Sequence, residues 1–366
     1  MTAVLDENVL DDENLLEAAD PGGMLRQVAS SAAQVRAGAR AAAEAELGAI
    51  LAPGRPRAIV VAGMGGSGIA GDILSAVCGS GCQIATVHDY QLPGWVGAAD
   101  LVVAVSCSGT TEETLAVAHE AARRGCHLAA VGAAGSPLAD LTAQARAPFI
   151  PVVSAGMPRS TLWGLSIPLV GIAQRLGLAD VGPNTYEETA RLLEDISHRC
   201  RPASDSFVNP AKALAAELAG HLPIIWGSSP LTGVVAYRFA CQLNENAKLP
   251  GMHGVLPEAN HNQVVPFDGP PLPLPLRLVM LTDSREFPLV AARRAASAQL
   301  AADRGIAVTE LAAEGDHPLL RLASLIQVID YATVYLALGT GIDPSPITAI
   351  QELKSLVREG RGYSRK

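Results

Sequence analysis

The stretch RAIVVAGMGGSG, residues 57–68, decides the fold because it joins a strand directly to a glycine-rich turn. The β-branched run within it is typical of a strand buried in a parallel sheet. The apolar residues of 69–77 predict a helix that starts just after the turn. A helix N-terminus offers unpaired N–H groups and a positive dipole end, and glycine lets an anion approach the backbone. The stretch therefore predicts a strand–turn–helix unit that binds an anion, most naturally a phosphate.

A second junction of the same kind is expected at SCSGTTEET, residues 106–114, between a strand at 101–105 and a helix at 112–124. Hydroxyls and amide N–H groups at a helix start can form an anion-binding nest. Thr111 is also a candidate N-cap, because Ser and Thr side chains accept bonds from the first helical amides. Capping explains one hydroxyl but not the cluster, so we predict that this junction also binds phosphate.

Short apolar runs alternate with helical patterns along the chain, which predicts an α/β fold with parallel sheets flanked by helices. Residues 1–54 are expected to form an N-terminal helical segment, 55–200 a first α/β domain, and 211–366 a second. The polar stretch 201–210 is the expected linker. The expected strands are 57–63, 83–88, 101–105, 127–132, 149–153, 222–226, 277–282 and 306–311. Similarity between LPIIWGSSP at 222–230 and the opening stretch suggests an internal duplication.

Composition excludes several classes of protein. The net charge of -9 and the 4% aromatic content argue against a nucleic-acid partner, which requires basic surfaces. Six scattered cysteines without a CxxC pair suggest neither a zinc site nor a disulfide framework. The acidic N-terminus does not resemble a signal peptide. No stretch is expected to span a membrane, because Asp330 interrupts the apolar run 325–338, so a soluble cytoplasmic protein is expected.

A dinucleotide-binding oxidoreductase is the main alternative from the motifs alone. Gly63, Gly65 and Gly68 satisfy the GxGxxG fingerprint, and Asp89 follows the second strand where a ribose-binding acid is expected. Such an enzyme has no need of the hydroxyl cluster at 106–114. A sugar phosphate bound at the C-terminal ends of neighbouring parallel strands would use these hydroxyls, so we favour a sugar phosphate as the ligand.

The two junctions together resemble the sugar-isomerase (SIS) fold, in which a glycine–serine loop is followed by an SxSGxTEET loop. Further motifs resemble one branch of that fold, the bifunctional phosphoglucose/phosphomannose isomerases. The resemblance covers about residues 57–354. The motifs are GMPR at 156–159, NENAK at 244–248, PEANHN at 257–262, and DPSP at 343–346 leading to Leu353-Lys354.

This resemblance implies a role for each candidate catalytic residue. Glu245 corresponds to the base that moves a proton between C1 and C2 of the sugar, with Glu258 as a rival carboxylate. Arg159 corresponds to the cation that stabilises the enediolate. His261, contributed by the partner subunit in the family, and Lys354 correspond to ring-opening or substrate-holding groups. The implied phosphate-binding residues are Gly66, Ser67, Ser106, Ser108 and Thr111.

The resemblance also implies a fold of two SIS domains and a metal-independent isomerase without a cofactor, acting on a phosphorylated hexose. A homodimer with shared active sites is implied as well. Cys107 stands where the family commonly has tyrosine, and Gln263 where it often has glutamate. A hydroxyl near the C-terminal lysine is linked to tolerance of both C2 epimers, and Ser345 and Thr348 are both candidates. A non-catalytic SIS protein that senses a sugar phosphate would share the phosphate loops and stays an alternative.

Overall fold

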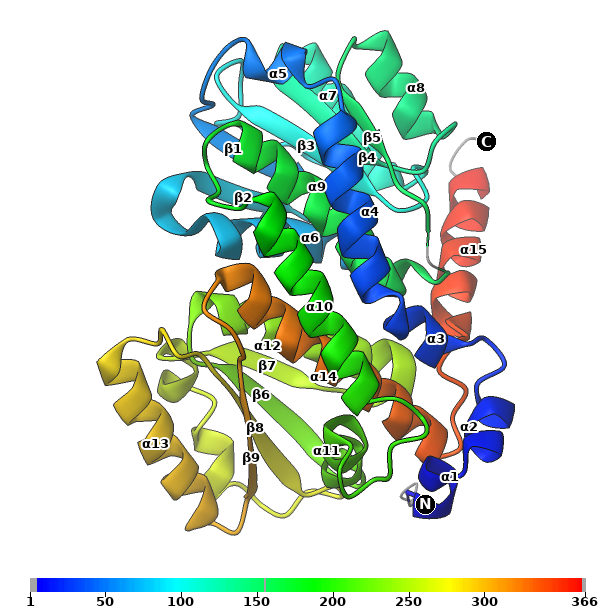
Figure 1. The fold of residues 1–366 in the computed structure, drawn as a ribbon, viewed down its shortest axis with the longest axis vertical. Coiled ribbons are helices and arrows are strands. Elements are labelled where there is room, and N and C mark those ends of the chain that lie inside the picture. Colours follow the sequence, from blue (N-terminus) through cyan, green and yellow to red (C-terminus); the bar gives the residue numbers. More distant parts are fainter. Residues whose placement is uncertain (1–4, 155, 364–366) are drawn as a thin grey trace.

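The computed structural model describes residues 5–154 and 156–363 and contains two parallel β-sheets (Figure 1). Apolar, β-branched runs form the strands of the first sheet, in which β1 and β3 are buried along their whole length. The strand order is β2 (Gln83–Val87), β1 (Ala58–Ala62), β3 (Leu101–Ser106), β4 (His127–Gly132) and β5 (Phe149–Pro151).

The second sheet repeats the pattern with four strands. Its order is β7 (Met252–Val255), β6 (Leu222–Gly227), β8 (Leu276–Thr282) and β9 (Ala307–Ala312). In each sheet the first strand of the half lies between the second and the third. An internal duplication produces such a repeat, and the carboxyl ends of β1 and β6 therefore occupy equivalent places.

Helices form most of the connections between the strands, since parallel pairing requires crossovers. The α/β class and the predicted strands are confirmed, but the sequence analysis missed β7 and three consecutive helices, α8 to α10. The helices after the N-terminal ones are α6 (Gly66–Cys78), α7 (Glu112–Arg123), α8 (Pro137–Gln144), α9 (Leu162–Arg175), α10 (Pro183–Arg199), α11 (Pro210–Leu218), α12 (Pro230–Gln242), α13 (Pro288–Ala302), α14 (Pro318–Gly339) and α15 (Thr348–Tyr363).

The N-terminal residues fold as helices that pack on the rest of the molecule. Helix α4 lies along α9 and α10, and α1 contacts α14. Close approach of α4 to α9 depends on Gly38, where an added Cβ would lie 2.9 Å from Ile167. The N-terminal helices are α1 (Glu7–Asp11), α2 (Glu13–Ala19), α3 (Met24–Ala29), α4 (Ser31–Glu44) and α5 (Gly48–Leu51).

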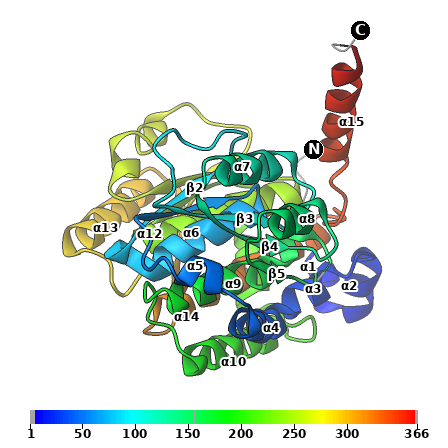
Figure 2. The same ribbon diagram turned by 90° about the horizontal axis from the view of Figure 1, so that it is seen from above.

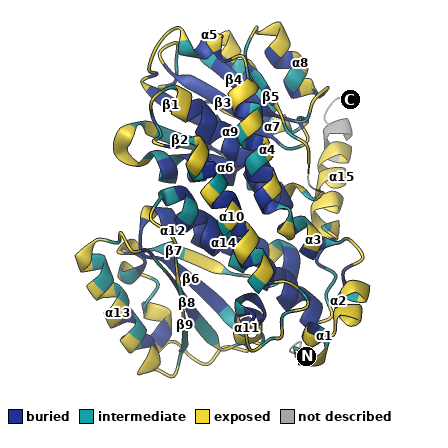
Figure 3. Ribbon diagram, viewed as in Figure 1, coloured by how far each residue is buried: buried dark blue, intermediate teal, exposed yellow. Residues whose placement is uncertain are grey.

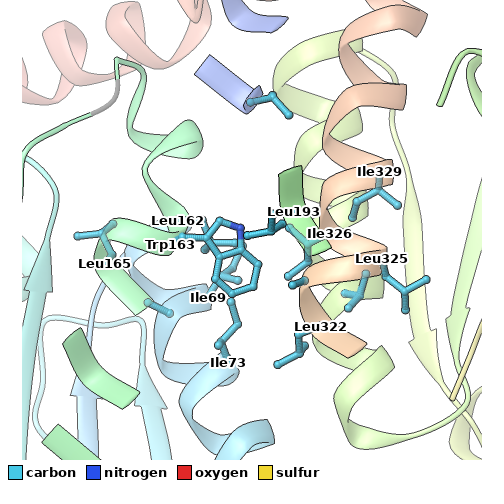
Figure 4. Packing of buried hydrophobic residues seen from close by; sticks show 14 of the residues in the cluster. Ile69, Ile73, Leu162, Trp163, Leu165, Leu193, Leu322, Leu325, Ile326 and Ile329 are labelled. Carbon is cyan, nitrogen blue, oxygen red and sulfur yellow. The ribbon is translucent and has the colours of Figure 1, made fainter. Parts of the chain in front are cut away.

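One apolar cluster joins the two halves. Figure 4 shows Ile69 and Ile73 of α6 with Trp163 of α9, facing Leu322 and Ile326 of α14. The side chains on both sides are almost completely buried. Since α6 also contacts α12 and α14, the two sheets are fixed relative to one another through a shared core.

Helix α14 corrects the expectation that no stretch could span a membrane. By length and composition α14 is apolar enough to do so, despite Asp330. Its apolar window is completely buried inside the protein, as Figure 3 shows by its dark colour. The carboxylate of Asp330 is neutralised by Arg238 of α12, whose Nε donates to Asp330 Oδ1 at 2.9 Å. Helix α14 is therefore the central helix of the core.

Candidate active site

The first predicted phosphate junction is a strand–turn–helix unit, as expected. After β1 the chain turns at Gly65, whose φ of +54° favours glycine, and α6 begins at Gly66. No side chain caps this helix start. His88 supports the turn, because its Nδ1 lies 3.0 Å from the Gly63 carbonyl oxygen. Ser67 is buried in the first turn of α6, with an exposure of 8%.

The second junction lies beside the first. The amide of Cys107 donates to Ser67 Oγ at 3.4 Å and so links the two loops. Ser106 Oγ lies 2.9 Å from Thr111 Oγ1 and accepts a bond from the Gly109 amide at 3.0 Å. Thr111 occupies the N-cap position of α7, but its side chain makes no capping bond. The capping expectation for Thr111 is therefore wrong, because Ser106 engages its hydroxyl instead.

Ser108 completes the second loop. Its Oγ lies 2.9 Å from Thr110 Oγ1 and accepts a bond from the Thr110 amide at 3.3 Å. Ser108 is exposed, whereas Ser106 is buried at the end of β3. The loop therefore has one serine hydroxyl on an exposed residue and one on a buried residue.

Arg159 lies against the first junction. It sits in the 3-10 turn η2 (Pro158–Ser160), and an added Cβ on Gly66 would lie 3.8 Å from its Cα. Arg159 is 4% exposed, and its Nε donates to Asn246 Oδ1 at 2.8 Å. Its Nη2 donates to the Pro344 carbonyl at 2.6 Å. These bonds fix the plane of the guanidinium.

Glu245 faces this guanidinium. Its Oε2 lies 3.6 Å from Arg159 Nη1, and the Glu245 side chain stays 31% exposed. Burial lowers the pKa of Arg159, while the negative charges of Glu245 and Asp343 act in the opposite direction. Arginine remains protonated in proteins, so the pair presents a fixed positive charge beside an accessible carboxylate.

A π-helical turn places Glu245. The turn η3 (Leu243–Ala247) follows α12 directly and inserts an extra residue into the helical repeat. The chain then leaves the helix at Lys248, which has a φ of +55°. Lys248 Nζ donates to the carbonyl of Glu245 at 2.6 Å and to that of Pro346 at 2.8 Å. Lys248 thus ties the Glu245 turn to the C-terminal DPSP segment.

Comparisons with known proteins identify the family. Residues 207–357 match the model "Bacterial phospho-glucose isomerase C-terminal SIS domain". A "Bifunctional phosphoglucose/phosphomannose isomerase" of Caldicellulosiruptor bescii is 34% identical over 304 residues, covering 82% of this chain and 89% of the relative. A protein of the same name from Thermoplasma volcanium is 31% identical, covering 81% and 90%. This chain belongs to the bifunctional phosphoglucose/phosphomannose isomerase family.

A solved structure supports the fold. A hypothetical protein from Thermus thermophilus superposes with a TM-score of 0.73 over 94% of both chains, at 17% identity. Together with the family match, this confirms the two-domain SIS fold expected from the motifs. Asp89, the candidate ribose acid of the dinucleotide alternative, is exposed and accepts a bond from the next amide, that of Tyr90, at 2.6 Å.

Two predicted site residues of this isomerase-family member lie apart from the Arg159–Glu245 pair. His261 is exposed in the turn η4 (Glu258–His261), which also carries the rival Glu258. Lys354 is exposed on α15, which projects from the body of the protein (Figure 2). Within residues 5–154 and 156–363, no hydrogen bond or ion pair joins His261 or Lys354 to the pair.

The structure separates the two candidate hydroxyls for epimer tolerance. Ser345 is 8% exposed, and its carbonyl accepts a bond from Arg159 Nη2 at 3.3 Å. Thr348 is exposed at the start of α15. Of the two, Ser345 is the one in contact with the predicted catalytic arginine.

Sequence reasoning missed the residues that hold the arginine. Asn246 is completely buried between Arg159 and Thr333, donating to Thr333 Oγ1 at 3.0 Å. Arg238 donates to the Arg159 carbonyl at 3.1 Å while it pairs with Asp330. The NENAK motif contained Asn246, and Asp330 was visible as a charge within an apolar run. Neither pattern indicates which side chains Asn246 and Asp330 contact in the folded protein.

A large hollow of the protein lies elsewhere. It has a volume of about 1040 Å³ and lies between the α4–α5 region and β5, with Arg146 and Arg175 in its lining. It contains neither of the hydroxyl-rich junctions. The arrangement of chemical groups, rather than cavity size, therefore locates the candidate site at Arg159 and Glu245.

Proposed function

We propose that this protein is an aldose–ketose isomerase that interconverts glucose 6-phosphate, mannose 6-phosphate or both with fructose 6-phosphate. The observation that carries the proposal is the Arg159–Glu245 pair, 3.6 Å apart and directly beside the glycine-rich junction. A base and a cation beside a phosphate-binding loop are what proton transfer on a sugar phosphate requires.

The proposed mechanism uses one carboxylate for both proton transfers. Glu245 removes the proton from C2 of the open-chain aldose. The C–H electron pair forms the C1=C2 double bond, and the carbonyl electrons move to O1, giving a cis-enediolate. Arg159 stabilises the negative oxygen with a charge that needs no reorganisation. The protonated Glu245 then returns the proton to C1, and the proton on O2 passes to O1, so that the carbonyl forms at C2.

The two junctions are proposed to hold the phosphate at the far end of the sugar. Gly66 and Ser67 lie at the positive end of α6, and the second loop lies one hydrogen bond away. Ser106, Ser108 and Thr111 supply the remaining hydroxyls. With the phosphate fixed there, C1 and C2 can lie near Glu245, so binding at one end of the substrate orients its reacting end.

Ring opening is proposed to involve a second copy of the chain. The family resemblance assigns it to His261 of the partner subunit and to Lys354, and both are exposed in the single chain. Helix α15 makes no extensive contact with another described helix or strand, and its Leu353 and Leu356 are 60% and 65% exposed. A homodimer would cover this apolar row and complete each site with His261.

Mixing two inactive variants tests the shared site. Heterodimers of Glu245→Gln and His261→Ala subunits should regain part of the lost activity, because one of their two sites is intact. Confirmed heterodimers without any regained activity would place the whole site in one chain.

A coupled assay tests the function itself. Purified protein receives fructose 6-phosphate with EDTA present, and glucose 6-phosphate and mannose 6-phosphate are measured separately. Turnover in EDTA supports a metal-independent isomerase without a cofactor, and the product ratio reports whether it is bifunctional. Ser345 is proposed to be the hydroxyl that permits both epimers, so Ser345→Ala should change that ratio more than Thr348→Ala.

A non-catalytic sensor remains the second candidate, because it would use the same phosphate loops. It predicts thermal stabilisation by sugar phosphates without turnover. An oxidoreductase predicts stabilisation by nicotinamide cofactors instead. The acidic chain is proposed to act in the cytoplasm, with neither a nucleic-acid nor a membrane partner.

A further inference from the structure

Gln27 of α3 holds the loop that carries Arg159. Its Oε1 accepts a bond from the Met157 amide at 2.7 Å, and its Nε2 donates to the Gly22 carbonyl at 2.8 Å. The loop lies directly on this side chain, because an added Cβ on Gly156 would lie 2.3 Å from Gln27 Oε1. Gly156 has a φ of +131°, so the close approach depends on glycine.

Gln34 of α4 holds the other side of the same loop. Its Nε2 donates to the Ser160 carbonyl at 2.7 Å, and its Oε1 accepts a bond from the Gly164 amide at 3.1 Å. Gln34 is 7% exposed, so these polar groups are paired within the protein. Together with Gln27, it fixes the backbone two residues before and one residue after Arg159.

The same N-terminal segment encloses the guanidinium. Met24 Sδ lies 4.0 Å from Arg159 Nη2, and Met24 is completely buried. An added Cβ on Gly22 would lie 1.9 Å from Ser345 Oγ. Since Arg159 also donates to the Ser345 carbonyl, the arginine lies between the N-terminal turn and the C-terminal segment.

We propose that Gln27 and Gln34 are positioning residues that set the place of the Arg159 guanidinium for catalysis. This inference rests on the proposed role of Arg159 as the cation that stabilises the enediolate. Such stabilisation depends on a preorganised charge, and a misplacement of about 1 Å can lower a rate about 100-fold. The N-terminal helices, whose function the sequence left open, would thus be part of the catalytic apparatus.

The direct test removes the Gln27 side chain. Gln27→Ala should lower kcat about 10- to 100-fold, while KM changes less than about threefold, because the phosphate loops are untouched. Binding of glucitol 6-phosphate, which has no carbonyl to isomerise, should likewise be retained. Gln27→Glu keeps an acceptor for the Met157 amide but loses the donor to the Gly22 carbonyl, so it should recover only part of kcat. A KM rise without loss of kcat would overturn the proposal.

Gln327→Ala is the matched control. Gln327 of α14 is completely buried and donates to the Val28 carbonyl at 3.1 Å and to Ser197 Oγ at 2.8 Å. It therefore also anchors the N-terminal helices but makes neither of the bonds to the Arg159 loop. Gln327→Ala should lower the melting temperature and leave kcat near that of the wild type. Equal kcat losses in Gln27→Ala and Gln327→Ala would mean that Gln27 only supports the fold.

Hydrogen exchange separates failure of this inference from failure of the proposed function. In Gln27→Ala the amides of residues 156–163 should exchange faster, and in Gln327→Ala they should not. This readout does not need turnover. An inactive wild-type protein would refute the isomerase proposal, whereas unchanged protection in Gln27→Ala would refute the positioning role of Gln27.

Discussion

The two strand-to-helix junctions after β1 and β6 occupy equivalent places but are built differently. At the first, Gly65 turns the chain, and the hydroxyl of Ser67 takes part in a single long bond of 3.4 Å. At the second, Ser229 caps α12 in a capping box with Thr232 and donates to Asp283 Oδ2 at 2.8 Å. The β6 junction therefore already contains an anion of its own.

A cation accompanies that internal anion. Arg321 of α14 lies 3.0 Å from Asp283 Oδ1, and both side chains are about 95% buried. The junction after β1 offers glycine and hydroxyl groups to a ligand, whereas the β6 junction pairs its charges within the chain. The duplicated scaffold thus uses one junction for binding and the other to fix α12, the helix that leads to Glu245.

Removing the proposed base should produce the largest effect. Glu245→Gln should lower kcat about 10³- to 10⁴-fold and leave KM nearly unchanged, because the base acts only in the transition state. Steady-state kinetics with fructose 6-phosphate measure both constants. Glu258→Gln, in the exposed turn that also carries His261, is the control and should retain kcat. A larger loss in Glu258→Gln would move the base to that turn.

Opening the β6 junction should lower stability rather than activity. Asp283→Ala leaves Arg321 buried without its carboxylate, and removal of one partner of a buried pair costs about 3–5 kcal/mol. Urea unfolding measures this loss, and kcat of the folded protein should change little. Inorganic phosphate should restore part of the lost stability by occupying the vacated place.

Asp268→Ala is the matched control for that prediction. Asp268 pairs with Arg304, but their side chains are 68% and 33% exposed. An exposed pair contributes about 1 kcal/mol or less. If the Asp283 and Asp268 variants lost equal stability, the internal ion pair would not be what distinguishes the β6 junction.

The hydroxyl of the first junction should affect substrate binding. Ser67→Ala should raise KM about 10-fold, the size expected for one hydrogen bond to a charged phosphate, with a smaller change in kcat. Ser229→Ala removes the equivalent hydroxyl of the β6 junction and should lower stability by about 1 kcal/mol without changing KM. Equal KM values in the two variants would contradict a difference between the junctions.

The strands next to both junctions could be predicted because each is a short, apolar, β-branched run bounded by turn residues. Strand β4 was predicted with its observed bounds, 127–132. The edge strand β7 was missed because MHGV has no such pattern. Helix α9 was missed because it is buried on nearly all sides and contains Pro168, so it shows neither amphipathic period nor uninterrupted helix formers.

Part of the candidate site could likewise be predicted from the sequence. Local motifs indicated the hydroxyls, and the resemblance indicated Arg159 and Glu245. The support for Arg159 was not predictable, because Gln27 and Gln34 bond to residues 130 and 126 positions away. A single sequence does not show which side chains meet at that separation.

The smallest expected effect concerns the half-buried carboxylate of Asp72, which has no arginine partner among the ion pairs of the described residues. Asp72 of α6 accepts a bond from Thr86 Oγ1 at 2.7 Å, and burial raises its pKa, against the opposing effects of Thr86 and His88. A raised pKa means that the folded state holds the proton more tightly, so stability falls as pH rises from 3.8 through the raised value.

Asp72→Asn keeps an acceptor for Thr86 and cannot ionise. Its stability relative to the wild type should therefore be greater at pH 8 than at pH 4, as measured by urea unfolding. Asp283→Asn should destabilise at pH 8, because it removes the charge that pairs with Arg321. If the difference in unfolding free energy between wild type and Asp72→Asn stayed constant from pH 4 to pH 8, ionisation of Asp72 would not destabilise the folded protein.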